Sequence, residues 1–217
     1  MNVAERYRRG GAALVEGLLS PEVAQAMARQ IAMGIAQGGR RWLVPPSIGA
    51  KPCYEVSCMQ WPALLTFLWG MTPRIEQIAG VRLLPTYSYF RTYQHGDVCR
   101  IHADRPACEH SLSLTLAYAD GIVWPLEVAD TPVAPAQRQT ERGDDDFGAE
   151  PHTALPMQPG DGVIYRGYDY RHGRTSGNPN RWSAHLFMHW VDRDGPYRGQ
   201  AFDGKPLLGP VDFRFPA

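Results

Sequence analysis

The sequence predicts a mainly β protein with flanking helices, and three observations support this fold class. Apolar residues recur at helical spacing up to Gly80, whereas from Val81 onward the chain is rich in aromatic and β-branched residues. Residues 111–118 alternate polar and apolar side chains, which is the pattern of a strand. A chain of 217 residues with 44% hydrophobic residues is the right size for one domain with a substantial core. We therefore expect one domain over 1–217, with its helices covering one side of a sheet.

The N-terminal part predicts two helices. The first begins at Pro21, where Ser20 can serve as the N-cap, and it carries apolar residues at helical spacing. The second occupies 61–79 and is interrupted by Pro73, because proline removes a helical hydrogen bond. Between them, 40–60 contains several prolines and predicts a loop with short extended pieces.

Strands dominate the rest of the chain. The expected strands are 83–93, 98–102, 111–118, 121–128, 163–170 and 182–191. Residues 173–180 predict the loop between the last two strands. Residues 130–156 contain several prolines and the acidic run 144–146, so we expect a mobile surface insertion, with a lid over bound substrate as the alternative.

Composition excludes several classes of function. Lys plus Arg and Asp plus Glu both number 22, so net charge gives no case for binding nucleic acid or an anionic membrane. There is no signal-peptide pattern and no apolar run of about 18 residues, the length that spans a membrane. The four cysteines show no C-x-x-C spacing and are expected to be reduced. These features predict a cytoplasmic protein.

The most informative motif is His102-Ala-Asp104, followed by His172 and then by Arg181-Trp-Ser183. Side chains at i and i+2 of a strand share a face, so His102 and Asp104 should project together, with Ala103 turned outward. Two imidazoles and one carboxylate suit Fe(II), Mn(II), Co(II) or Zn(II), and three protein ligands leave positions open for reactants. An arginine after the second histidine is what such a site needs to hold an acidic co-substrate.

In context, these motifs resemble a known family. The matching stretches are Tyr93-Gln-His-Gly-Asp97, 102–111, Pro159-Gly-Asp161, His172-Gly-Arg174 and Arg181-Trp-Ser183. Together they resemble the 2-oxoglutarate and Fe(II)-dependent oxygenases, in particular the prolyl-hydroxylase-like branch. The resemblance covers roughly 14–195 and implies a double-stranded β-helix, a jelly-roll or cupin-like barrel with helices packed on its major sheet and a metal at its mouth.

The resemblance also implies residue roles. His102, Asp104 and His172 are the expected Fe(II) ligands. Arg181 is expected to bind the distal carboxylate of 2-oxoglutarate, because a planar guanidinium matches a carboxylate fork, and Ser183 is expected to donate a second hydrogen bond.

Further residues are expected around the co-substrate and the substrate. Tyr93 matches a tyrosine that hydrogen-bonds the co-substrate in relatives, and His185 shares the face of Arg181 and is expected to line the pocket. The candidate substrate contacts are Arg91, Arg105, Trp124 and Arg174, of which Arg174 is also the rival of Arg181. The remaining histidines that we expect to be packed or at the surface are His110, His152 and His189.

The implied activity is hydroxylation of an unactivated C–H bond with O2, releasing succinate and CO2. The expected substrate is a small molecule, an amino acid or a peptide. Because Asp104 is present, no ligand position is left for a halide, which disfavours halogenation. Alternatives are a same-fold Fe(II) enzyme that acts without 2-oxoglutarate or that desaturates or closes a ring, a non-catalytic barrel that binds a small acid or sugar, and a metal-dependent hydrolase or isomerase.

Overall fold

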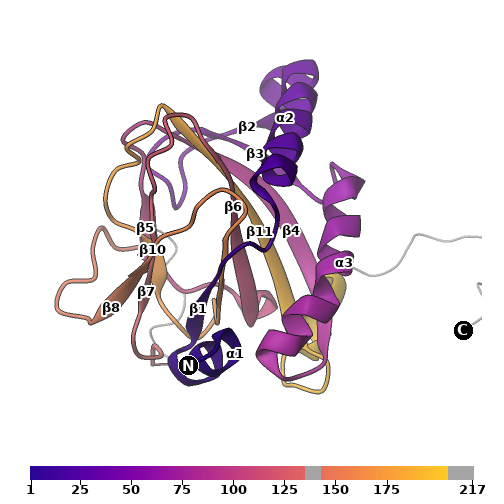
Figure 1. Cartoon of the computed structure of the whole chain (residues 1–217), viewed down its shortest axis with the longest axis vertical. Coiled ribbons are helices and arrows are strands. Elements are labelled where there is room, and N and C mark those ends of the chain that lie inside the picture. Colours follow the sequence, from indigo (N-terminus) through magenta and orange to yellow (C-terminus); the bar gives the residue numbers. More distant parts are fainter. Residues whose placement is uncertain (135–142, 205–217) are drawn as a thin grey trace, which may run out of the picture.

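Two antiparallel β-sheets face each other, and helices cover the outer side of the larger sheet (Figure 1). This computed structural model describes residues 1–134 and 143–204. The major sheet has seven strands in the order β1-β9-β6-β11-β4-β3-β2, and the minor sheet has four in the order β5-β10-β7-β8. This arrangement is a double-stranded β-helix, so the predicted fold class is confirmed.

The elements have the following bounds. The helices are α1 (Val3–Gly10), α2 (Pro21–Gly38) and α3 (Pro62–Ala79), with 3-10 turns η1 (Gly39–Trp42), η2 (Pro106–Cys108) and η4 (Arg198–Gly204). The major sheet contains β1 (Ala12–Val15), β9 (Gly162–Tyr165), β6 (His110–Tyr118), β11 (Trp182–Asp192), β4 (Leu83–Gln94), β3 (Cys53–Ser57) and β2 (Leu43–Val44). The minor sheet contains β5 (Cys99–His102), β10 (His172–Arg174), β7 (Leu126–Ala129) and β8 (His152–Leu155).

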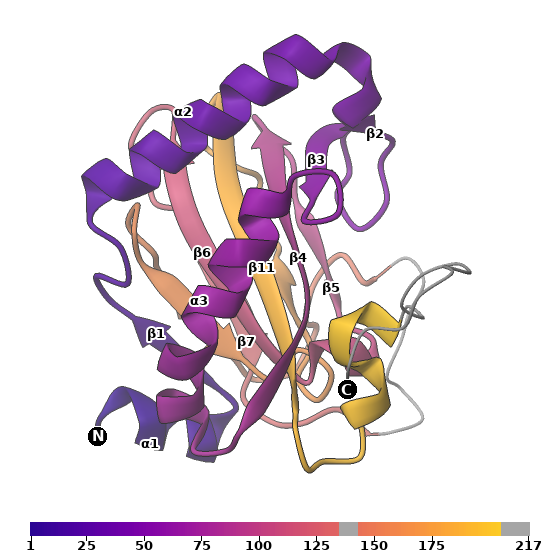
Figure 2. The ribbon, with the colours of Figure 1, turned by 90° about the vertical axis from the view of Figure 1, so that its right-hand side faces the viewer.

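The main core lies between the helices and the outer face of the major sheet, which α2 and α3 cross (Figure 2). The Ser20 hydroxyl caps α2 by accepting from the Val23 backbone N–H, as the sequence predicts. Leu68 and Ile75 of α3 are fully buried against the sheet. Each such side chain stabilises the fold by roughly 1.5–3 kcal/mol.

The helix α3 is continuous, so the expected interruption at Pro73 is wrong. Proline removes the donor that would bond the carbonyl four residues earlier, at Trp69. Trp69 is 51% exposed, and water can therefore satisfy that carbonyl without breaking the helix.

Several short elements differ from the expectation. The segments α1, β1 and β8 were not predicted as helix or strands, and β10 extends into the expected loop 173–180. The expected strands 121–128 and 163–170 are shorter, at Leu126–Ala129 and Gly162–Tyr165. No helix in the described part of the chain is both long and apolar enough to cross a membrane.

The expected insertion 130–156 is only partly described, because 135–142 lie outside the described residues. In the remainder, Asp145 pairs with Arg100 at 3.2 Å, and β8 pairs with β7. The expectations that this segment is mobile and that the chain is one domain stay predictions.

The inner face of the major sheet is polar although it is buried. Ser111, Ser113 and Thr115 of β6 are fully buried, and their apolar neighbours in the strand point to the helix-covered core. The neighbouring strand β11 repeats this pattern, with Ser183 and His185 on its inner face. A buried polar face of this kind is expensive unless its groups are hydrogen-bonded or bind a ligand, so the space between the sheets is the candidate site.

Candidate active site

Three predicted ligands converge at the facing ends of β5 and β10. His102 is the last residue of β5 and pairs in register with His172, the first residue of β10, which brings their rings to 4.5 Å between centroids. Asp104 follows β5 by two residues. Its Oδ1 lies 3.5 Å from His102 Nε2, and its Oδ2 lies 3.5 Å from His172 Nε2. The candidate ligand atoms all lie within 4.8 Å of one another. Ala103, which was expected to turn outward, is only 8% exposed.

Backbone carbonyls orient both imidazoles. His102 Nδ1 lies 2.8 Å from the Arg100 carbonyl oxygen, and His172 Nδ1 lies 2.9 Å from the Tyr170 carbonyl oxygen. A carbonyl only accepts, so each Nδ1 carries the proton and each Nε2 presents its lone pair to the centre of the group. Fixing the tautomer through the second ring nitrogen is the usual way in which proteins prepare histidine for a metal.

The charge states suit a cation. Burial lowers the pKa of His172 to about 4, so its imidazole is neutral near pH 7. Burial alone would raise the pKa of Asp104, but in acid, where the neighbouring rings of His172 and His102 can be protonated, their positive charge outweighs burial and holds that pKa below its usual value. Asp104 Oδ2 is buried and has no hydrogen-bond partner among the described residues, as expected of an oxygen that is meant to bind a cation.

Gly167 packs directly against the Asp104 carboxylate and helps to fix its position. The Gly167 carbonyl accepts from the Asp104 backbone N–H at 2.8 Å. A Cβ at Gly167 would lie 2.3 Å from Asp104 Oδ2 and 2.6 Å from Ser111 Oγ, which is closer than atoms approach. Only glycine fits there without moving the carboxylate.

A buried cation lies two residues beyond His172 on the same strand. Arg174 has no exposed surface, and its Nη2 reaches Ser113 Oγ at 3.5 Å. Its Nε and Nη1 have no hydrogen-bond partner in the described part of the chain. The guanidinium lies over the rings of Trp124, at 5.0 Å, and Tyr93, at 5.9 Å. A buried charge without a counterion is strongly unfavourable, so the site is built to receive an anion.

Polar groups from β11 and the loop after β10 line the same side of the barrel. His185 Nδ1 lies 3.2 Å from Thr115 Oγ1, and His185 Nε2 lies 3.2 Å from Ser183 Oγ. Asn178 Nδ2 donates to Ser183 Oγ at 3.2 Å and to the Tyr93 carbonyl at 3.0 Å. Burial and the nearby positive charge of Arg174 lower the pKa of His185 well below its usual value, so this ring is neutral.

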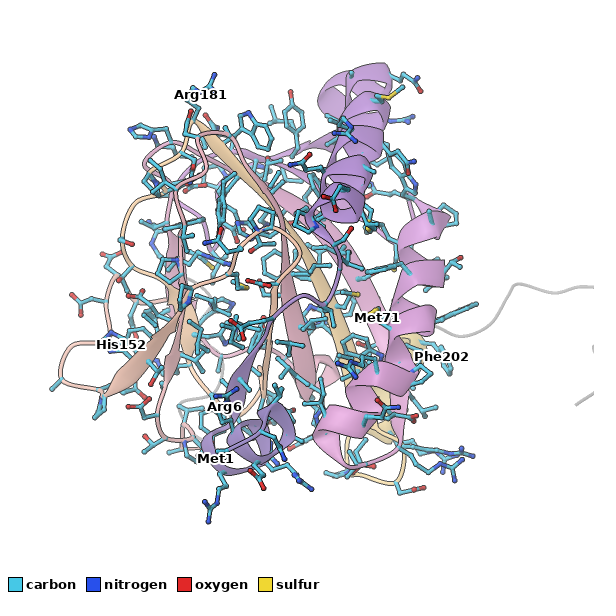
Figure 3. All side chains as sticks on the ribbon, in the orientation of Figure 1. Met1, Arg6, Met71, His152, Arg181 and Phe202 are labelled. Atoms are coloured by element: carbon cyan, nitrogen blue, oxygen red, sulfur yellow. The ribbon has the colours of Figure 1, made fainter. Side chains whose placement is uncertain are left out.

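The structure does not bring Arg181 into this site, which corrects its expected place. The Arg181 side chain is 76% exposed and pairs with Asp120, with Nε 2.8 Å from Oδ1. It projects from the end of the molecule (Figure 3). Although Arg181 precedes Ser183 by two residues, it comes before the first residue of β11, so strand alternation does not direct its side chain into the barrel.

The other expected contacts are divided between the barrel and its rim. Trp124 is buried, and its Nε1 donates to the Ser176 carbonyl at 2.8 Å. Tyr93 is buried against Trp124, with 5.1 Å between ring centroids, and burial raises the pKa of its hydroxyl. Arg91 already pairs with Glu55 at 2.5 Å.

Arg105 lies nearer the rim. It stacks over the Tyr87 ring at 4.4 Å and pairs with Asp203 at 2.5 Å.

One buried histidine beside the metal group was missed by sequence reasoning. His110 packs against Tyr7 and His152 is exposed, as expected. His189 is buried, as a packed histidine is, but it lies next to Asp104, together with Cys108, which was not expected. The available signal was period-two spacing along β11, because His189 lies four residues after His185 and therefore on the same inner face.

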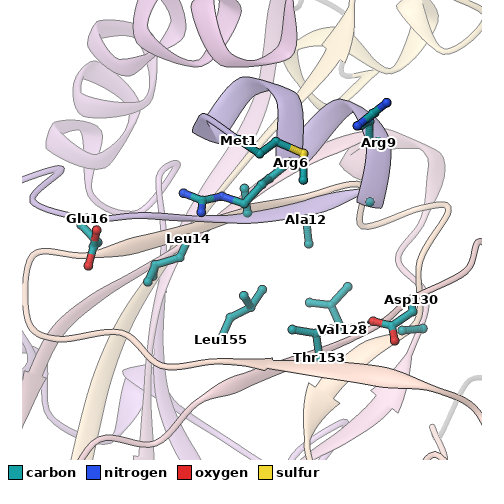
Figure 4. Close-up of a pocket in the computed structure, with 13 residues that line it drawn as sticks. Met1, Arg6, Arg9, Ala12, Leu14, Glu16, Val128, Asp130, Thr153 and Leu155 are labelled. Carbon is teal, nitrogen blue, oxygen red and sulfur yellow. Dashed lines mark hydrogen bonds between the residues drawn. The ribbon is translucent and has the colours of Figure 1, made fainter.

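A separate cleft of about 640 Å³ lies between the N-terminal segment and the edge of the minor sheet (Figure 4). Its walls include Leu14 of β1, Val128 of β7 and Leu155 of β8, with Arg6 and Asp130 at the sides. None of the three converging ligands lines it. This cleft is therefore distinct from the candidate active site.

Solved structures match nearly the whole chain. The alpha ketoglutarate-dependent carbocyclase SnoK from nogalamycin biosynthesis aligns with a TM-score of 0.72 and 14% identity, covering 96% of this chain and 93% of that chain. The alpha ketoglutarate-dependent epimerase SnoN from the same biosynthesis aligns with a TM-score of 0.67 and 18% identity, covering 98% and 91%. A Pseudomonas putida prolyl-4-hydroxylase aligns with a TM-score of 0.56 and 16% identity, covering 86% and 96%.

The fold is that of the non-haem 2-oxoglutarate oxygenases. At these identities the likeness establishes the fold and leaves the chemistry to the residues of the site. No protein-family model and no curated protein matches the sequence.

Proposed function

We propose that this chain is an Fe(II)- and 2-oxoglutarate-dependent oxygenase that oxidises an unactivated C–H bond of a small molecule, an amino acid or a peptide. The proposed outcome is hydroxylation, with release of succinate and CO2. The observation that carries the proposal is the convergence of two oriented imidazoles and one carboxylate beside a buried arginine that has no counterion among the described residues.

His102, Asp104 and His172 would hold the metal. Their Nε2 atoms, together with the carboxylate oxygen that has no hydrogen-bond partner among the described residues, form the nitrogen and oxygen donor set that suits Fe(II). Iron with 2-oxoglutarate and O2 supplies the oxidising power for C–H cleavage. Three protein ligands would leave coordination positions free for the co-substrate and O2. Because Asp104 occupies the third position, the site favours hydroxylation over halogenation.

Arg174, rather than Arg181, would bind the distal carboxylate of 2-oxoglutarate. It follows His172 by two residues, and two residues of strand advance about 6.6 Å, a separation that a five-carbon diacid bound at its other end can bridge. A carboxylate placed there would satisfy Nε and Nη1 and form a charge-assisted pair away from water. Ser113, at 3.5 Å from Nη2, would complete the anion site.

The surrounding side chains keep this end of the barrel dry and rigid. Trp124 and Tyr93 are buried, and their rings cover the Arg174 guanidinium. The Asn178 amide holds Ser183 and the end of β4 in place through three hydrogen bonds. A dry site strengthens the pairing of Arg174 with an anion.

The buried cation also favours this function over the alternatives. An Fe(II) oxidase that acts without 2-oxoglutarate would have no use for Arg174 as an anion site, and it would carry the cost of an unpaired buried charge without benefit. Similarity to a carbocyclase and an epimerase makes ring closure and inversion the competing outcomes of C–H oxidation. Product mass separates them, because hydroxylation adds one oxygen atom.

The test is an anaerobic titration with Fe(II) followed by 2-oxoglutarate. We expect a weak visible metal-to-ligand band when both are bound, and no band in a His172→Ala variant, which loses one ligand. Arg181→Met serves as the matched control and should keep the band. A folded wild-type protein that gives no band would contradict the proposal. A screen for succinate release over candidate substrates then identifies the substrate class.

A further inference from the structure

A second group of potential metal ligands lies on the other side of Asp104. This group consists of Asp104, Cys108 of η2 and His189 of β11. Each residue offers one ligand atom, and the three atoms lie within 4.8 Å of one another. Cys108 has no exposed surface and His189 is 2% exposed, whereas the Asp104 side chain is 17% exposed.

Two atoms of this group are buried without partners. His189 Nδ1 lies 2.8 Å from Ser111 Oγ, which fixes the ring, but His189 Nε2 has no hydrogen-bond partner in the described ranges 1–134 and 143–204. Asp104 Oδ2 is in the same condition. A buried polar atom left without a hydrogen bond is unfavourable, so two of them in one place indicate a missing ligand.

The chemistry of the donors indicates which ligand. A cysteine sulfur beside an imidazole and a carboxylate is a donor set for borderline or soft cations such as Zn(II), whereas the group of His102, Asp104 and His172 offers only nitrogen and oxygen. Cys108 is a free cysteine, and its Sγ lies 3.1 Å from the Tyr87 hydroxyl, which can hydrogen-bond a thiolate.

We propose that Asp104, Cys108 and His189 form a second site for a thiophilic divalent cation such as Zn(II). On binding, the Cys108 S–H proton leaves to solvent and a metal–sulfur bond replaces it, without any change of oxidation state. Bond lengths of about 2.0–2.3 Å set ligand separations of roughly 3.3–3.8 Å, so the three side chains need to close by at most about 1.5 Å. Because Asp104 belongs to both groups, Zn(II) bound here weakens Fe(II) binding at the first group.

Co(II) tests this site separately from the first one. A thiolate bound to Co(II) gives an intense near-ultraviolet charge-transfer band, which ligation by nitrogen and oxygen alone does not give. In a His102→Ala/His172→Ala variant, which lacks the first group, we expect this band on adding Co(II). It should disappear on adding Zn(II) and should be absent when Cys108→Ser is introduced. Cys99→Ser is the matched control, because Cys99 is also buried but lies outside the group, and it should leave the band unchanged.

Wild-type protein decides the question if the double variant does not fold. There, the same band should appear with Co(II) and be lost in Cys108→Ser, and His189→Ala should weaken its apparent affinity at least tenfold. Absence of the band in wild-type protein, or a band that survives Cys108→Ser, would overturn the second site. Neither result bears on the Fe(II) and 2-oxoglutarate band of the first group, so the two proposals fail separately.

Discussion

Replacing Arg174 with methionine is the perturbation that best separates the two arginine assignments. Methionine keeps an apolar chain of similar length between Trp124 and Tyr93 but removes the charge and its donors. The matched variant is Arg181→Met, which removes an exposed guanidinium that pairs with Asp120. Our account assigns 2-oxoglutarate binding to the first arginine and not to the second.

The expected magnitudes follow from burial. Removing one partner of a buried, hydrogen-bonded charge pair typically costs about 2–5 kcal/mol, which corresponds to a loss of roughly 30- to 4,000-fold in 2-oxoglutarate affinity. The Arg181 side chain is exposed and pairs with Asp120 away from the site, so Arg181→Met should change that affinity by less than about fivefold. Without ligand, Arg174→Met should leave stability unchanged or raise it, because it removes a buried charge that no described residue neutralises.

Anaerobic calorimetry with Fe(II)-loaded protein measures the affinities, and urea unfolding measures the stabilities. Fe(II) affinity in the absence of 2-oxoglutarate should be nearly equal in both variants, which separates loss of the anion site from loss of the metal site. If Arg181→Met weakened 2-oxoglutarate binding more than Arg174→Met did, the transfer of the role to Arg174 would be wrong.

Two further predictions concern the metal group and its histidines. Gly167→Ala should weaken Co(II) or Fe(II) binding at least tenfold, because the new Cβ would lie 2.3 Å from Asp104 Oδ2. Gly70→Ala is the control, because a Cβ there would meet no atom within 4 Å. Equal metal affinities of the two variants would refute the reasoning. The metal-free protein should lose stability as the pH falls from about 6.5 to about 4. Burial lowers the pKa of His110, His172 and His189 to about 4, so in this window the unfolded chain binds protons that the folded chain does not. Each group contributes on the order of 3 kcal/mol at most over that window, and unfolding midpoints that stay constant from pH 7 to pH 4.5 would contradict this.

The shared face of His102 and Asp104 was predictable because strand alternation is a local rule. The i, i+2 spacing of His102 and Asp104 predicts a shared face, although Asp104 lies just beyond the end of β5. The pairing of His172 with His102 is a tertiary contact that the sequence indicates only through the resemblance to a family. The fold class followed from the change of periodicity near Val81.

The arginine assignment needed the structure. Spacing from His172 favoured Arg181, but spacing along a chain does not say where a strand begins, and Arg181 falls just outside β11. Residue Arg174 was expected in a loop and lies instead in β10, a strand too short to show a periodic pattern. Alternation in β6 predicted the strand but not that its polar face would be the buried inner wall, because periodicity does not tell which face meets water.

The most direct test of the central claim is an anaerobic crystal structure with Fe(II) and 2-oxoglutarate, with anomalous diffraction recorded at the iron edge. We predict one iron peak bounded by His102, Asp104 and His172, and a co-substrate whose distal carboxylate pairs with Arg174. An iron peak elsewhere, or a distal carboxylate bound to Arg181 with Arg174 left unpaired, would contradict the account.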